Sequence, residues 1–131
     1  MSSNSEMLRS WGTTLLRVVV GAVFVAHGVQ KLFKGFTNLG DFLMSAGIPY
    51  PTIAAVVLTL AELLGGIAMI LGVLTRYVAI MLAFDMAVAI IMVHWKNGFF
   101  MPNGYEYAMV LLAANIFLVL SGGGAVELYK P

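Results

Sequence analysis

The chain has 131 residues, of which 61% are hydrophobic and 10% are charged, and its formal net charge is +1 at pH 7. Because an ordinary soluble domain carries about 25% charged residues, this composition predicts an integral membrane protein whose immediate partner is the lipid bilayer. The nearly neutral charge argues against nucleic acid as a partner. The sequence contains no cysteine, which excludes disulfides, thiol redox relays and cysteine-ligated metal sites, so any redox chemistry needs a bound cofactor or a partner protein.

The chain begins with a polar, serine-rich segment that leads into a first apolar stretch. Residues 1–10 show no periodicity, and we expect a frayed tail on the membrane surface, followed by Trp11 as an interfacial anchor. A helix over residues 12–33 is long enough to cross the bilayer, because each residue adds about 1.5 Å. Arg17 interrupts the apolar stretch and no small-residue cleavage pattern follows it, so we expect it to be retained rather than removed as a signal peptide.

Four polar side chains lie inside this first helix: Arg17, His27, Gln30 and Lys31. At about 100° per residue, His27 and Lys31 fall within about 80° of Arg17, so the three share one face of the helix. A charge at bilayer depth costs at least about 2.5 kcal/mol, and this face should therefore point at protein or at a wet cavity. We expect its polar partners on the other helices.

The second spanning helix follows a link that is too polar to cross the membrane. Residues 38–47 have the spacing of a short amphipathic helix lying in the interface, with Asn38 as its N-cap, and prolines end the link. A spanning helix is expected over residues 52–73. Its one ionisable residue, Glu62, lies near the centre and needs a partner inside the bundle.

Two further apolar helices complete the chain. The third is expected over residues 77–95 and carries Asp85 and His94, and the fourth is expected over residues 105–121. Short links between four apolar helices predict an all-α integral membrane protein, an antiparallel four-helix transmembrane bundle with the short interfacial helix between helices 1 and 2, forming one domain over residues 1–131. Both termini then lie on one side, and although the basic residues divide almost evenly, we favour cytoplasmic termini.

The directions of the helices gather polar residues towards one membrane face. Helices 1 and 3 run the same way, so His27 and His94 lie towards the face where Glu106 enters helix 4, and Glu62 can meet them from below. We therefore expect a polar pocket for ligand binding or proton relay, open towards the first and third loops. Its expected members are His27, Gln30, Lys31, Glu62, His94, Tyr105 and Glu106.

Structural ion pairs explain some of these charges equally well. We predict that Lys31 and Glu106 share one site, because each would otherwise be uncompensated near hydrocarbon. We also predict that Arg17 forms a structural ion pair with Glu62 or Asp85. Such pairs neutralise charge and set the register of the helices.

Two local patterns leave alternatives open. Asp85 and His94 are nine residues apart, about 180° around a regular helix, so only one of them can face a narrow site and the sequence does not choose which. Gly65 and Gly66 lie one turn beyond Glu62. We favour close helix packing for them over the alternative, which is space for a flat ring beside the carboxylate.

An ordered set of short motifs runs through the chain: R-x3-G and H-G-x2-K (Arg17, Gly21, His27, Gly28, Lys31), G-x-P (Gly47, Pro49), E-x2-G-G (Glu62, Gly65, Gly66), L-G-x2-T-R (Leu71, Gly72, Thr75, Arg76), a histidine closing helix 3 (His94), and G-Y-E (Gly104, Tyr105, Glu106). As an ordered set these motifs resemble the DoxX family of small four-span membrane proteins, and the match covers nearly the whole chain. Near the C-terminus, where that family often has aspartate, this chain has Glu127.

The resemblance implies quinone-coupled oxidoreduction in the bacterial cytoplasmic (inner) membrane. It implies a small subunit of a sulfur or quinol oxidoreductase, or of a membrane complex that handles oxidative stress. The expected partners are another protein subunit and, as an alternative, further copies of the same chain in a homo-oligomer. Our first hypothesis is therefore that the polar pocket binds a quinone or quinol, because quinone reduction needs proton donors beside the carbonyl oxygens. None of these patterns assigns a catalytic residue.

Other functions fit the same residues. The protein is alternatively a non-catalytic membrane anchor or assembly partner whose charges pair internally or with another subunit. A haem or metal site would use His27 and His94 with Glu62 or Glu106, but without an H-x3-H or E-x2-H pair on one helix we expect no metal and disfavour haem. A small transporter or channel is the remaining class.

Overall fold

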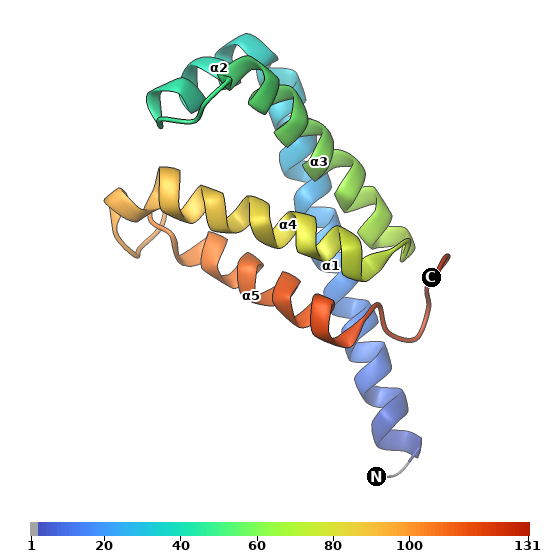
Figure 1. The fold of residues 1–131 in the computed structure, drawn as a ribbon. Helices are drawn as coiled ribbons and strands as arrows, with labels where there is room; N and C mark the ends of the chain where they lie inside the picture. The colour runs from blue at the N-terminus through green and yellow to red at the C-terminus, as the bar shows by residue number, and fades with distance from the viewer. Residues whose placement is uncertain (1–2) are drawn as a thin grey trace.

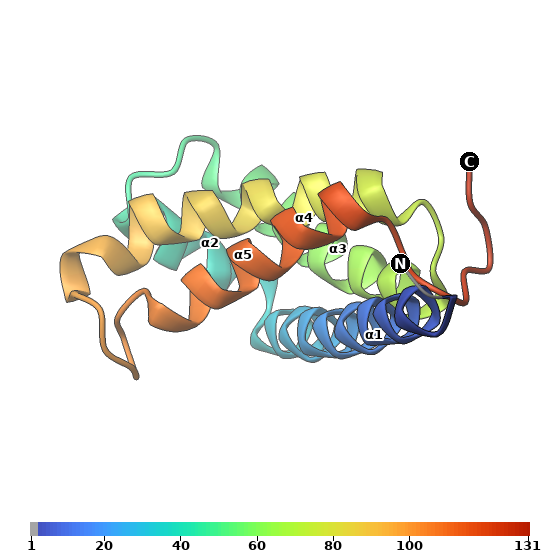
Figure 2. The ribbon, with the colours of Figure 1, turned by 90° about the horizontal axis from the view of Figure 1, so that it is seen from below.

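The structure, a computed structural model, describes residues 3–131, and the regular elements in that range are helices apart from one isolated bridge between Val73 and Tyr129. In the two views, α1 and α3 lie side by side, α4 and α5 form a second pair, and α2 packs on α3 (Figures 1 and 2). The all-helical prediction is therefore confirmed for the described residues. The elements are α1 (Ser3–Lys34), α2 (Phe36–Ser45), α3 (Pro51–Leu71), α4 (Thr75–Ala89), the π-helix η1 (Ile90–His94), the 3-10 helix η2 (Trp95–Asn97) and α5 (Glu106–Ser121).

Within residues 3–131, three helical segments are long and apolar enough to cross a membrane, namely α1, α3 and the run Thr75–Asn97. Helix α5 is apolar as well, but it has 16 residues. That length spans only about 24 Å, less than a hydrocarbon core about 30 Å thick. The helices thus support a membrane protein, while the crossing by α5 and the interfacial position of α2 stay predictions.

Helices α1 and α3 pack backbone to backbone through glycines. A Cβ added to Gly21 would lie 2.7 Å from the carbonyl oxygen of Gly66, and one added to Gly28 would lie 2.8 Å from the Cα atom of Leu63. Gly65 is buried on another side of α3, against α4. Packing is therefore the confirmed interpretation of Gly65 and Gly66, because small residues let membrane helices approach closely.

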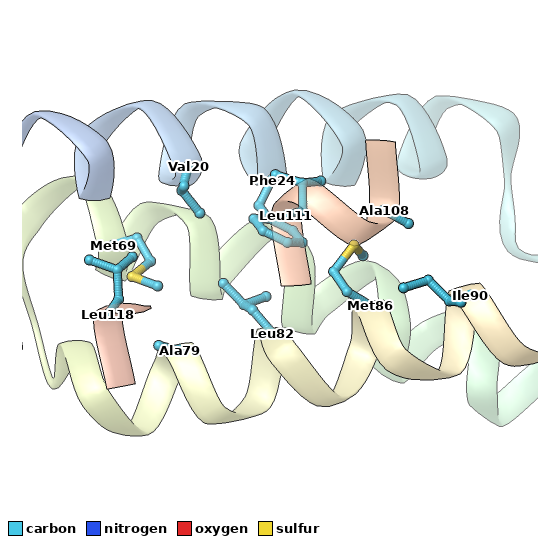
Figure 3. Close-up of a cluster of buried hydrophobic side chains, with 10 residues drawn as sticks. All are labelled: Val20, Phe24, Met69, Ala79, Leu82, Met86, Ile90, Ala108, Leu111 and Leu118. Atoms are coloured by element: carbon cyan, nitrogen blue, oxygen red, sulfur yellow. The ribbon is translucent and has the colours of Figure 1, made fainter. Parts of the chain in front are cut away.

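The apolar core joins the two helix pairs (Figure 3). Phe24 of α1, Met69 of α3, Leu82 of α4 and Leu118 of α5 are each at most 1% exposed. Because every one of these four helices contributes a fully buried side chain, the contacts tie the α1–α3 pair to the α4–α5 pair.

The N-terminal segment is helical, so the expected frayed tail is wrong for residues 3–10, whereas residues 1 and 2 lie outside the described range. No proline interrupts this segment. The hydroxyl groups of Thr13 and Thr14 each donate to the carbonyl oxygen four residues earlier, at 3.0 Å. Helix α1 continues past the end of α5 (Figure 1).

The link helix α2 begins at Phe36, and its N-cap residue is Gly35, so the predicted Asn38 cap is wrong. The side-chain amide of Asn38 instead donates to the Lys34 carbonyl oxygen at the end of α1, at 2.8 Å. Gly35 has a φ of 86°, a left-handed conformation that glycine adopts without steric cost. This glycine permits the sharp change of direction between α1 and α2.

The C-terminal segment, residues 122–131, crosses the turn between α3 and α4 and contacts α1. The Leu128 amide donates to the Leu71 carbonyl oxygen at 3.0 Å, and the Leu74 amide donates to the Tyr129 carbonyl oxygen at 3.2 Å. Another amide of this segment donates to the Thr14 hydroxyl at 2.8 Å. The expected polar tail is therefore an ordered part of the bundle.

Arg17 fastens this segment to the bundle. Its side chain is 2% exposed, and Nη1 donates to the carbonyl oxygens of Gly123, at 2.7 Å, and Val126. Nη2 donates to a carbonyl oxygen in the last turn of α3 at 3.4 Å. The predicted ion pair of Arg17 with Glu62 or Asp85 is wrong, because these carbonyl groups occupy the guanidinium.

Candidate functional site

A cavity of about 590 Å³ lies among all five α-helices, towards the C-terminal ends of α1 and η1. We call it the histidine cavity. Most of its wall is apolar, from side chains such as Phe24, Leu43, Leu58 and Met86. Its size falls in the range of about 300 to 1,000 Å³ that is usual for small-molecule sites. The polar side chains in its wall are those of His27, Lys31, Glu62, Asp85, His94 and Tyr107.

An ion pair joins α1 and α3 at the edge of this cavity. Lys31 Nζ lies 2.8 Å from Glu62 Oε1, with the two side chains 20% and 3% exposed. Gly28 brings α1 against the α3 backbone, so the side chain one turn later meets the carboxylate. The predicted pair of Lys31 with Glu106 is wrong, because Glu106, at the start of α5, accepts a hydrogen bond from the Met101 amide at 2.6 Å.

Asp85 of α4 faces the same ion pair. Its carboxyl group lies beside that of Glu62 and within electrostatic range of the Lys31 ammonium group. Its Oδ2 atom is buried and has no hydrogen-bond partner among residues 3–131. Asp85 is therefore not the ion-pair partner of Arg17 that we predicted, and one ammonium group serves two carboxyl groups in the cavity wall.

Both histidines are oriented by backbone carbonyl groups. His27 Nδ1 lies 2.8 Å from the Val23 oxygen, and His94 Nδ1 lies 3.1 Å from the Asn103 oxygen. Since a carbonyl oxygen only accepts, the neutral ring carries its hydrogen on Nδ1 and keeps a lone pair on Nε2. The His27 ring also stacks on Tyr107, with 6.1 Å between ring centroids. Each histidine thus offers an acceptor of fixed orientation.

The structure answers the open question about Asp85 and His94, because both line the histidine cavity. Residues 90–94 form a π-helix, whose wider turn advances each residue by less than the α-helical value of about 100°. The angle between the two side chains is therefore smaller than a regular helix would give. Single π turns of this kind often occur at functional sites.

Three predicted site residues lie outside the cavity wall. Gln30 is exposed, Glu106 binds the loop backbone, and Tyr105 stacks on Trp95 with 4.9 Å between ring centroids. Tyr107, which the sequence analysis missed, lines the cavity instead. Helical spacing could have identified it, because it lies one turn before the cavity residue Leu111.

The geometry offers little to a metal ion. Among residues 3–131, no group of three or more histidine or carboxylate side chains is arranged to hold one. His27 and His94 come from different helices and each uses Nδ1 for a backbone carbonyl group. The haem and metal hypothesis gains no support from this arrangement.

Known proteins resemble the chain along most of its length. The DoxX family model matches residues 12–95. A Bacillus subtilis (strain 168) protein named "Putative oxidoreductase CatD" is 39% identical over 111 residues, covering 85% of this chain and 79% of that protein. A Haemophilus influenzae protein is 32% identical over 130 residues, 96% of this chain and 94% of its own. The Escherichia coli (strain K12) "Inner membrane protein YphA" is 28% identical over 120 residues, 87% and 85% of the two chains. No solved structure matches.

Proposed function

This chain belongs to the DoxX family of membrane proteins, and from that premise we propose that it is the membrane subunit of a quinone- or quinol-linked oxidoreductase system. The name of the Bacillus subtilis relative supports the reaction class and says nothing of the substrate. The substrate class is supported by the histidine cavity. We place a quinone headgroup there, beside the Lys31–Glu62 ion pair.

The observation that carries the proposal is a polar cluster set in a mostly apolar cavity wall. A quinone combines an apolar ring and tail with two polar oxygens on opposite edges of the ring. The apolar wall suits the ring and tail, while the ring oxygens need hydrogen bonds that only the polar cluster offers in this surrounding. Both requirements are met within one cavity of suitable size.

The polar cluster can bind both redox forms. The Lys31 ammonium has three donors and spends one on Glu62, so others are left for the carbonyl oxygen of a quinone. The unpartnered Asp85 Oδ2 and the Nε2 atoms of His27 and His94 accept, which suits the hydroxyl groups of a quinol. The same groups can hold the protons that accompany reduction or oxidation of the ring. A partner subunit would supply electrons when a quinone is reduced and accept them when a quinol is oxidised.

The test is binding of decylubiquinone to the full-length protein in lipid nanodiscs. Binding is measured by the quenching of tryptophan fluorescence. We expect saturable binding that His27→Ala weakens about tenfold, the loss of one good hydrogen bond and its packing. The matched control is Gln30→Ala, which changes an exposed residue on the same helix outside the cavity.

A second matched pair separates the cavity from its surroundings. Glu62→Gln removes a carboxylate from the cavity wall, whereas Glu106→Gln removes one that binds the loop backbone. Only the first should weaken quinone binding. If binding does not saturate, or if both members of each pair bind equally well, the quinone proposal is wrong.

A role as membrane anchor or assembly partner is the second candidate function. It is favoured by the pairing of Lys31 with Glu62 and by the hydrogen bonds of Arg17 to backbone carbonyl groups, all within the chain. Under this function the protein would bind no quinone, and deleting it would destabilise a partner subunit. We place the chain in the bacterial inner membrane, in keeping with the name of the Escherichia coli relative.

A further inference from the structure

A second cavity, of about 640 Å³, lies at the other end of the bundle, where α1 passes the start of α4 and the end of α5. We call it the terminal cavity. Its wall is formed by α1 residues such as Arg9 and Thr13, by Arg76, by Ser121 and by the C-terminal segment. It shares no lining residue with the histidine cavity.

Three cationic side chains surround the terminal cavity: Arg9, Arg76 and Lys130. All three are exposed, and in the described part of the chain none of them forms a salt bridge or a side-chain hydrogen bond. The one carboxylate in the wall, Glu127, interacts with the buried Arg17 guanidinium behind the cavity. The cavity therefore has an excess of positive charge that no described residue neutralises.

Two hydroxyl groups in the wall of the cavity are already used as donors. The Thr13 hydroxyl donates to the Arg9 carbonyl oxygen at 3.0 Å, and the Ser121 hydroxyl donates to the Gly122 carbonyl oxygen at 2.9 Å. The guanidinium groups of Arg9 and Arg76 and the ammonium group of Lys130 remain available to a ligand. An anionic ligand is the partner that such donors favour.

Part of the wall is bare backbone held in place by Arg17. Its hydrogen bond to the Gly123 carbonyl oxygen, at 2.7 Å, fixes the glycine run that follows α5. Gly122 has a φ of 81°, and a Cβ there would lie 3.3 Å from Arg76 Nε. The Arg76 guanidinium therefore packs against Gly122, which has no side chain that could fill this part of the cavity.

We expect the terminal cavity to lie at the level of the membrane surface. Helix α3 ends at Leu71, α4 begins at Thr75 and α5 ends at Ser121, all beside the same part of α1. Three exposed amphipathic aromatic residues belong to this level: Trp11, Tyr77 and Tyr129, at 53%, 64% and 57% exposure. Tryptophan and tyrosine concentrate where hydrocarbon meets lipid headgroups.

We propose that the terminal cavity binds the phosphate group of an anionic phospholipid headgroup. Basic side chains near helix ends attract anionic lipids, and here they surround a cavity rather than a flat surface. The acyl chains would lie along the exposed apolar faces of the neighbouring helices. This site is independent of the proposed quinone function, since it lies at the other end of the bundle.

The experiment is a lipid titration of the full-length, delipidated protein in neutral detergent. Lipid binding is measured by native mass spectrometry. Dioleoyl phosphatidylglycerol is the probe, and dioleoyl phosphatidylcholine is the zwitterionic comparison. We expect tighter binding of phosphatidylglycerol, weakened about fivefold for each cation removed by Arg76→Gln or Arg9→Gln, and weakened further by salt. The charge-matched controls are the single variants Lys34→Gln and Lys96→Gln, because both lysines are exposed at the other end of the bundle.

The outcomes separate a specific site from general charge attraction. Equal weakening by the lysine controls, or equal affinity for the two lipids, would overturn the site. Competition by millimolar inorganic phosphate, beyond the weakening caused by sodium chloride at the same ionic strength, would identify a free anion as the ligand and would overturn the lipid assignment. Lys130→Gln provides a third cation on a different segment, so a fault in the folding of one variant does not remove the test. Its dissociation constant should rise about fivefold as well.

Discussion

Lys31 Nζ of α1 lies 2.8 Å from Glu62 Oε1 of α3, and the Glu62 side chain is only 3% exposed. This ion pair lies where two helices already touch through Gly28, so its geometry is set by close packing and not by flexible surface side chains. It also places a charged donor in the wall of the histidine cavity. The Lys31–Glu62 pair therefore both links α1 to α3 and belongs to the proposed quinone site.

Removing one member of this pair should destabilise the protein. Lys31→Met leaves the Glu62 carboxylate buried and uncompensated, and we expect a loss of about 3 kcal/mol in the free energy of unfolding. The double variant with Glu62→Gln should recover part of that loss, because the Glu62 carboxylate that lost its ammonium partner is then absent. Reversible unfolding in mixed detergent micelles measures the coupling as a double-mutant cycle. A second cycle that combines Lys31→Met with Glu106→Gln should show no coupling energy. A coupling energy equal to that of the first cycle would contradict the pairing.

The α1–α3 contact should tolerate no added side chain. Gly66→Ala would put a Cβ 2.7 Å from the Gly21 carbonyl oxygen, and separating the helices should cost about 1 to 3 kcal/mol. Gly12→Ala is the matched control, since nothing lies within 4 Å of a Cβ there. That change should be neutral or stabilise the helix by up to about 1 kcal/mol. Thermal unfolding in detergent compares the two, and similar effects would show that the helices do not touch as described.

Helical periodicity predicted the buried face of the first helix. Arg17, Phe24 and Gly28 recur at helical spacing and are all buried, while Lys31 continues the same face and finds its carboxylate on α3. The apolar runs likewise located α1, α3, α4 and α5 to within a few residues, apart from the N-terminal extension of α1. Apolar periodicity within a single helix was therefore read correctly.

Partners between elements were harder to predict. Arg17 binds carbonyl groups of the C-terminal segment. Because every residue has a backbone carbonyl group, the residue types of a sequence do not indicate which one will be a partner. The π-helix η1 changes the direction in which the His94 side chain points, and it contains no proline or glycine that would have predicted it. Glu106 lies at the first turn of α5, where it binds the loop and not another helix. In each case backbone geometry decided the outcome.

Releasing the C-terminal segment should require the loss of only one side chain. Arg17→Met removes the hydrogen bonds to Gly123 and Val126, each made by a charged donor, so we expect faster hydrogen exchange at the Leu128 and Tyr129 amides. The free energy of unfolding should fall by at least about 2 kcal/mol.

Arg17→Lys separates charge from geometry in the same experiment. Lysine keeps the positive charge but lacks the planar fork that reaches several carbonyl groups at once. We expect its exchange rates to lie close to those of Arg17→Met. Rates like those of the parent protein would show that charge alone retains the segment.

The two termini should lie on the same side of the membrane. The C-terminal segment contacts the N-terminal half of α1 through the Thr14 hydroxyl and Arg17, so one crossing of the bilayer by α1 commits both ends to one face. Since the chain contains no cysteine, single cysteines can report their own location. An impermeant maleimide should label Asn4→Cys and Lys130→Cys only in inverted vesicles, which gives cytoplasmic termini, and Thr37→Cys with Lys96→Cys only in intact cells whose outer membrane has been permeabilised. Labelling of Asn4→Cys and Lys130→Cys from opposite sides would mean that the short helix α5 does not cross, and the four-span bundle would be wrong.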